Sequence, residues 1–64
     1  MYNTHAKSAD IIRELLAAGW FLDRVRGSQH VFKHPKRSGM VVVPHPKKDL
    51  GAGLVRAIRK QARL

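Results

Sequence analysis

The spacing of apolar residues changes twice along this chain, and this change constrains the fold more than any other feature. Apolar residues recur at helical spacing over residues 9–19, strand-like patterns follow between residues 20 and 43, and helical spacing returns over 53–62. The breaks between these segments are short and contain glycine or proline, which interrupt regular structure. The sequence therefore predicts a single domain, residues 1–64, with the element order α-β-β-β-α.

Two amphipathic helices are predicted, one near each end of the chain. The first covers ADIIRELLAAG (residues 9–19), with Ser8 as its N-terminal cap and Gly19 as a left-handed stop. The second runs from about Gly53 to Ala62. Their buried stripes are expected to consist of Ile11, Ile12, Leu15 and Leu16 in the first helix and of Leu54, Val55, Ile58 and Ala62 in the second.

Three strands are predicted between the helices, at residues 20–26, 29–34 and 40–43. Gly27-Ser28 is expected to turn the chain between the first two strands, and the polar segment KRSG (36–39) to form the loop before the third. Connections this short favour an antiparallel meander. Two helices packed on one face of such a sheet bury both apolar stripes, so the predicted class is α+β.

The second strand, QHVFKH, leaves one assignment open. Side chains alternate between the two faces of a sheet, so either Phe32 or Val31 points away from the core. His30 and His34 share the parity of Phe32, and on a strand their Cα atoms are roughly 13 Å apart, at about 3.3 Å per residue. That separation is too long for one zinc ion with bonds near ~2.1 Å. We therefore expect no metal site here, and interpret the two histidines as separate groups on one face.

The charge of the chain restricts its partners. Thirteen Lys and Arg residues oppose four Asp and Glu, which gives a formal charge of +9 at pH 7 and favours a polyanionic partner. Apolar residues make up 44% of the chain, which argues against a disordered basic tail. No apolar run reaches the roughly 18–20 residues that span a bilayer, no signal-peptide core is present, and cysteine is absent. The expected location is therefore the cytoplasm, with no membrane partner.

The basic residues gather in three places: near the end of the second strand, in the PHPKKD segment, and on the last helix. Runs of charge are usually solvated surface, but few acidic residues dilute these, which favours a phosphate-binding surface. The three groups are Lys33, Lys36 and Arg37; Lys47 and Lys48; and Arg56, Arg59, Lys60 and Arg63.

Five short motifs give the sequence a family resemblance. They are GW (19–20), GSxH (27–30), FKHP (32–35), VPHPKKDL (43–50) and RKQA (59–62). Each is weak alone, but together they cover nearly the whole chain and resemble the HicA family of toxins from bacterial toxin–antitoxin pairs. The resemblance implies a fold like that of double-stranded-RNA-binding domains and the activity of an mRNA interferase. It also implies a cognate HicB-like antitoxin that covers the active site.

The resemblance further implies a catalytic histidine directly after the Gly-Ser pair. Many family members carry histidine at both of the next two positions, and some rely on the first. This chain has Gln29 and then His30. An amide cannot transfer a proton, and other members combine a non-histidine polar residue with a following histidine. We therefore interpret His30 as the catalytic residue.

RNA carries its own nucleophile, so the expected mechanism needs no metal or cofactor. The 2′-hydroxyl attacks the adjacent phosphate, and His30 acts as general base or acid because the ordinary pKa of histidine, about 6.5, makes both protonation states accessible. His45 is a candidate for the second proton-transfer group, with a structural role between its two prolines as an equal alternative. Ser28 and Gln29 are expected to position the scissile phosphate, and the RNA backbone to be held by Lys33, Lys36, Arg37, Lys47 and Lys48.

Two other functions remain open at this point. The chain could be a non-catalytic RNA-binding module, in which the basic surface suffices and no histidine matters. It could also bind DNA by placing one helix in the major groove. Electrostatic attraction to phosphates serves all three functions, so charge alone does not separate them.

Overall fold

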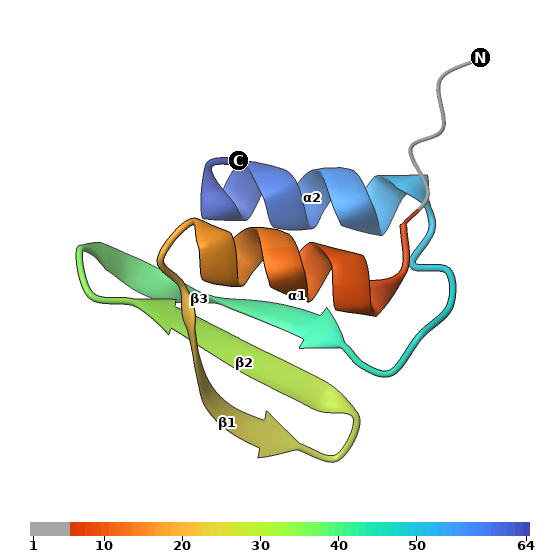
Figure 1. Cartoon of the computed structure of the whole chain (residues 1–64), viewed down its shortest axis with the longest axis horizontal. Helices are drawn as coiled ribbons and strands as arrows, with labels where there is room; N and C mark the ends of the chain where they lie inside the picture. Colours follow the sequence, from red (N-terminus) through yellow and green to blue (C-terminus); the bar gives the residue numbers. More distant parts are fainter. Residues whose placement is uncertain (1–5) are drawn as a thin grey trace.

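A computed structural model describes residues 6–64. Figure 1 shows a three-stranded sheet with two helices packed against it. Both strand pairs are antiparallel and the strand order is β1-β2-β3, which confirms the predicted α+β meander. The elements in chain order are α1 (Ser8–Ala17), β1 (Phe21–Arg26), β2 (Gln29–His34), β3 (Arg37–Pro44) and α2 (Ala52–Ala62).

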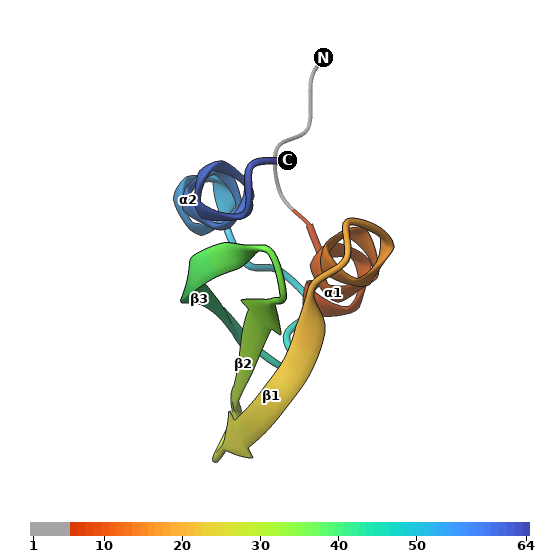
Figure 2. The same ribbon diagram turned by 90° about the vertical axis from the view of Figure 1, so that its left-hand side faces the viewer.

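The two helices lie side by side on the same face of the sheet, and the two views agree on this (Figures 1 and 2). The turn between β1 and β2 projects beyond the helices (Figure 2). All six residues of β1 are exposed as a result, whereas β2 and β3 each contribute buried side chains. The helices therefore cover strands β2 and β3, and strand β1 is left exposed.

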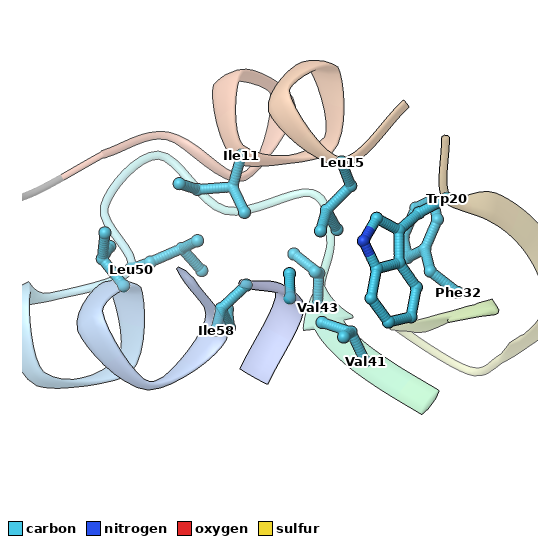
Figure 3. Close-up of a cluster of buried hydrophobic side chains, with 10 residues drawn as sticks. Ile11, Leu15, Trp20, Phe32, Val41, Val43, Leu50 and Ile58 are labelled. Atoms are coloured by element: carbon cyan, nitrogen blue, oxygen red, sulfur yellow. The ribbon is translucent and has the colours of Figure 1, made fainter. Parts of the chain in front are cut away.

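The hydrophobic core lies between the helices and strands β2 and β3 (Figure 3). Trp20 was predicted to begin the first strand, but β1 starts at Phe21. Trp20 instead packs beside Phe32 in this core. Only part of each predicted stripe is buried: Leu16 is 52% exposed and Leu54 is 40% exposed. Consecutive helical residues point about 100° apart, so a helix resting on one layer buries Leu15 or Val55 and turns the neighbouring leucine outward. The core consists of Ile11, Leu15, Trp20, Phe32, Val41, Val43, Leu50, Val55, Ile58 and Ala62.

The predicted loop KRSG was wrong, because β3 begins at Arg37 and leaves only two residues between the strands. His34 pairs with Arg37, so the ladder extends through polar residues that carry no hydrophobic signal. Backbone hydrogen bonds form a ladder whatever the side chains are, and this is why the alternation of apolar residues underestimates strand length.

The sequence left open whether Phe32 or Val31 of β2 points away from the core, and both side chains are buried. Phe32 is 1% exposed on the helix-facing side, in the core. Val31 is 3% exposed on the other side, in register with Arg24 and Val42. The guanidinium of Arg24 reaches to 3.9 Å from the sulfur of Met40, across the face on which Val31 lies.

One arginine of the basic stripe predicted on the last helix makes a contact that joins the two helices. Arg59 of α2 donates two hydrogen bonds to Glu14 of α1, from Nε at 3.0 Å and from Nη2 at 2.7 Å. Both side chains are partly exposed, so this bidentate pair joins the two helices at the surface. Arg59 is therefore already engaged with a carboxylate of the same chain.

Candidate active site

A second set of contacts outside the hydrophobic core joins three segments at one end of the sheet. The backbone N–H of His45 donates to the carbonyl of Ser28 at 2.7 Å, so the chain leaving β3 lies against the β1–β2 turn. The same segment reaches the start of α1, where Ser8 N–H donates to the carbonyl of Lys47 at 2.9 Å. This end lies at the right of Figure 1, where β3 ends and α1 begins.

His30 and His45 are in direct contact at this end. Their ring centroids are 4.8 Å apart and the rings are nearly perpendicular, at 82°. His30 is half-buried, and its Nδ1 is buried without a hydrogen-bond partner among the described residues. The two rings thus form one cluster where the chain leaving β3 meets the β1–β2 turn.

Ser8 is not the helix cap that the sequence predicted. It is the first residue of α1 and 1% exposed, and the N-cap is Lys7, which has no side-chain capping bond. The hydroxyl of Ser8 accepts a hydrogen bond from the N–H of Lys47 at 2.8 Å. The same oxygen lies 3.0 Å from the carbonyl of Lys47 and 2.7 Å from Nδ1 of His45. The Ser8 hydroxyl thus bonds to residues distant in sequence instead of capping its own helix. These bonds fix the start of α1 to residues 45–47.

An open pocket of about 540 Å³ lies beside these contacts. Three lysines, at positions 7, 47 and 48, contribute to its wall and are exposed. The first residues of α1 form another part, and the positive end of a helix dipole also favours an anion. The pocket thus carries the charge that suits a phosphate group. It is lined by Lys7, Ser8, Ala9, His45, Pro46, Lys47 and Lys48.

The structure separates the residues proposed from the sequence into two sets. His30, Ser28 and Gln29 lie at the end of β2 that meets the pocket, and the two lysines at 47 and 48 line that pocket. Lys36 and Arg37 lie at the opposite end of β2, in and after the turn to β3. Lys33 is on the other face of the sheet from His30, and its Nζ is 3.8 Å from a carboxylate oxygen of Asp23.

His34, the other histidine of the motif, lies at the far end of β2 with both ring nitrogens bonded. Its Nδ1 accepts a hydrogen bond from the N–H of Lys36 at 3.0 Å. Its Nε2 therefore carries the proton, and it donates to the carbonyl of Ala18 at 3.1 Å. The ring also meets Trp20 edge to face, with centroids 5.3 Å apart. A side chain at Gly19 would place its Cβ 2.8 Å from Nε2, so the GW and FKHP motifs form one structural unit.

Sequence reasoning missed Ser8 and Lys7 as members of the site. Ser8 reaches His45 across 37 positions of sequence, and its place before an apolar stripe has a sufficient local explanation as a cap. Lys7 carries no motif at all. Among residues 6–64, no three His, Cys, Asp or Glu side chains are grouped so that they could hold a metal ion. No helix in that part of the chain is long and apolar enough to cross a membrane.

Comparison with known proteins agrees with the motifs and the fold. A family model described as the HicA toxin of bacterial toxin–antitoxin systems matches residues 8–64. This range includes both helices, the whole sheet and the contacts among Ser8, His30 and His45. A comparison with curated proteins found no match. The extent of the family match is sufficient to conclude that the chain belongs to the HicA toxin family of bacterial toxin–antitoxin systems.

Proposed function

We propose that this toxin is a metal-independent endoribonuclease that cleaves mRNA in the cytoplasm, with His30 as a proton-transfer residue. One observation carries the proposal: the half-buried ring of His30 contacts the ring of His45, and His45 lines a pocket that three lysines surround. A proton carrier beside a positively charged pocket is what phosphodiester cleavage by the 2′-hydroxyl requires. Membership in the family supports the same class of activity.

The chemistry uses groups on both sides of the scissile bond. His30 assists the transfer of a proton as the 2′-oxygen attacks phosphorus and the bond to the 5′-oxygen breaks. Lys47 and Lys48 lie where they can offset the negative charge that develops on the phosphate. The products of this step are a 2′,3′-cyclic phosphate and a free 5′-hydroxyl.

Gln29 occupies a different environment from His30. It pairs with Arg26 and Pro44 at the first position of β2, is exposed, and points to the opposite face of the sheet. An amide has no proton to transfer at neutral pH. The proposal therefore assigns Gln29 to substrate contact at most and leaves the proton transfer to His30.

The family implies a cognate antitoxin. We further propose that the antitoxin covers the lysine-lined pocket, because a protein with acidic groups over this face neutralises the same charge that holds RNA. Complementary charge accelerates such an encounter, while the buried contact area determines how long the complex persists.

A cleavage assay tests the proposed activity directly. The purified toxin is incubated with a defined single-stranded RNA in excess EDTA, beside the variants His30→Ala and Gln29→Ala. We expect cleavage by the wild type, a loss of about 10²-fold or more in His30→Ala, and a change below about tenfold in Gln29→Ala.

Binding measured on the same proteins completes the test. His30→Ala should retain its affinity for RNA, because the lysines remain. If the wild type binds RNA but leaves it intact, the toxin is a binding module. If His30→Ala cleaves as fast as the wild type, another residue carries the proton. A preference for duplex DNA over RNA at fixed salt would instead indicate a DNA-binding function.

A further inference from the structure

The position of His45 suggests a role in the same reaction as His30, and this inference rests on the proposed function. His45 is the residue that joins the half-buried ring of His30 to the pocket, since it contacts the one and lines the other. It is half-buried and follows directly after β3. Cleavage of RNA by its own 2′-hydroxyl is fastest when one group accepts a proton and another donates one. Two imidazoles in contact can supply both groups.

The hydrogen bonds around Ser8 determine which protons His45 can carry. The hydroxyl has one proton and two lone pairs, and three polar atoms surround it. The N–H of Lys47 donates to the oxygen at 2.8 Å, and the carbonyl of Lys47 can accept the hydroxyl proton at 3.0 Å. The second lone pair then faces Nδ1 of His45 at 2.7 Å, where it accepts an N–H. In this arrangement every hydrogen-bonding site of the Ser8 hydroxyl is used.

The surroundings of the two rings are therefore unequal. Nδ1 of His45 has an oxygen to which an N–H can donate, so this ring can hold protons on both nitrogens. Nδ1 of His30 is buried with no acceptor among the described residues. Of the two rings, His45 is therefore the one with a partner that can hold an N–H at Nδ1 while Nε2 gives up its proton.

We propose that His45 is the general acid of the cleavage reaction, with His30 as its general base and Ser8 as the residue that positions His45. His30 takes the proton of the 2′-hydroxyl as the 2′-oxygen bonds to phosphorus. The bond from phosphorus to the 5′-oxygen breaks, and that oxygen takes a proton from Nε2 of His45. One proton is accepted and one is donated, so the enzyme regains its starting state by exchange with water.

The test exploits the fact that a good leaving group needs no acid. The variant is His45→Asn, because the amide nitrogen of asparagine can still donate to Ser8 while the proton for the leaving group is lost. The probes are two RNA oligonucleotides that differ only in the bridging atom at the scissile site, the natural 5′-oxygen or a 5′-sulfur. His30→Asn is the matched control, since loss of the base affects both substrates.

We expect His45→Asn to lose about 10²-fold or more in kcat on the oxygen substrate and less than about tenfold on the sulfur substrate. His30→Asn should lose a similar factor on both. Equal losses of His45→Asn on the two substrates would overturn the assignment. Failure of the wild type to cut either substrate would instead contradict the proposed endoribonuclease activity.

Two further measurements separate catalysis from folding. Thermal unfolding of His45→Asn shows whether the variant is folded, and His45→Gln, which keeps an amide nearer the Nε2 position, replaces it if it is not. The pH dependence of kcat on the wild type gives an independent readout. On the oxygen substrate it should be bell-shaped, and on the sulfur substrate the alkaline fall should disappear. An alkaline fall that persists with sulfur would contradict an acid at the leaving group.

Discussion

The two ends of β2 carry the same side chain on the same face and use it in opposite ways. At the far end, His34 has both ring nitrogens bonded to backbone groups and packs against Trp20. At the near end, Nδ1 of His30 has no hydrogen-bond partner among residues 6–64, and the ring touches a second imidazole beside an open pocket. Saturated hydrogen bonding makes His34 a structural residue, whereas an unsaturated ring next to positive charge leaves His30 available for chemistry. The proposed roles of the two histidines therefore rest on their contacts.

The largest expected effect separates the two histidines by activity. His30→Ala should lower kcat by about 10²- to 10⁴-fold with little change in thermal stability. His34→Ala should keep its activity per folded molecule but lose about 1–3 kcal/mol of unfolding free energy, because two backbone groups lose their partner. RNA cleavage and urea unfolding on both variants give the comparison. It fails if His34→Ala inactivates a fully folded protein.

The second-largest effect is a loss of stability expected at Gly19, which lies against His34 at the far end of β2. Gly19 has φ of +95° and leaves no room for a Cβ beside Nε2 of His34. Gly19→Ala should therefore cost about 2–4 kcal/mol in unfolding free energy, from backbone strain together with the displaced ring. The matched control is Gly27→Ala, at φ of +62° with nothing within 4 Å of the added Cβ, for which strain alone predicts about 1 kcal/mol. Equal losses would show that the contact with His34 does not matter.

A smaller loss is expected at the near end when its tether is cut. Ser8→Ala removes the hydroxyl that joins α1 to Lys47 and His45, and it leaves the Lys47 N–H without its side-chain partner. The expected cost is about 1–2 kcal/mol in unfolding free energy. It should also reduce kcat more than the affinity for RNA, because the orientation of His45 is lost. A Ser8→Ala variant that cleaves at the wild-type rate would contradict the positioning role.

The smallest effect compares lysines at the two ends. Lys48→Ala should weaken RNA binding and make it less dependent on salt, with the slope of log K against log salt reduced by about 0.7 per lost phosphate contact. Lys36→Ala, at the far end of β2, should leave that slope closer to the wild-type value. Titrations at several salt concentrations decide between them. Equal changes would place the RNA along the whole sheet.

The sequence was sufficient to predict the order of elements, the meander and the shared face of His30 and His34, because these depend on local spacing. It was not sufficient for the near-end site. Ser8 has a complete local explanation as a cap, and only the folded chain shows that its hydroxyl is bonded 37 and 39 positions away instead. The prediction that Leu16 is buried was wrong for a related reason. Periodicity identifies an apolar stripe but not how much of that stripe the facing layer covers.

The hydrogen bonds between Ser8 and residues 45–47 also have a consequence for the synthesis of the toxin on the ribosome. The proposed acid and base lie on β2 and just after β3, and the residue that orients the acid lies at the start of α1. While the ribosome is still making the first two strands, a nascent chain has no His45 and no tether. The proposed ribonuclease site is therefore complete only once most of the polypeptide has been translated, and the chain is not expected to cleave the message that encodes it before then.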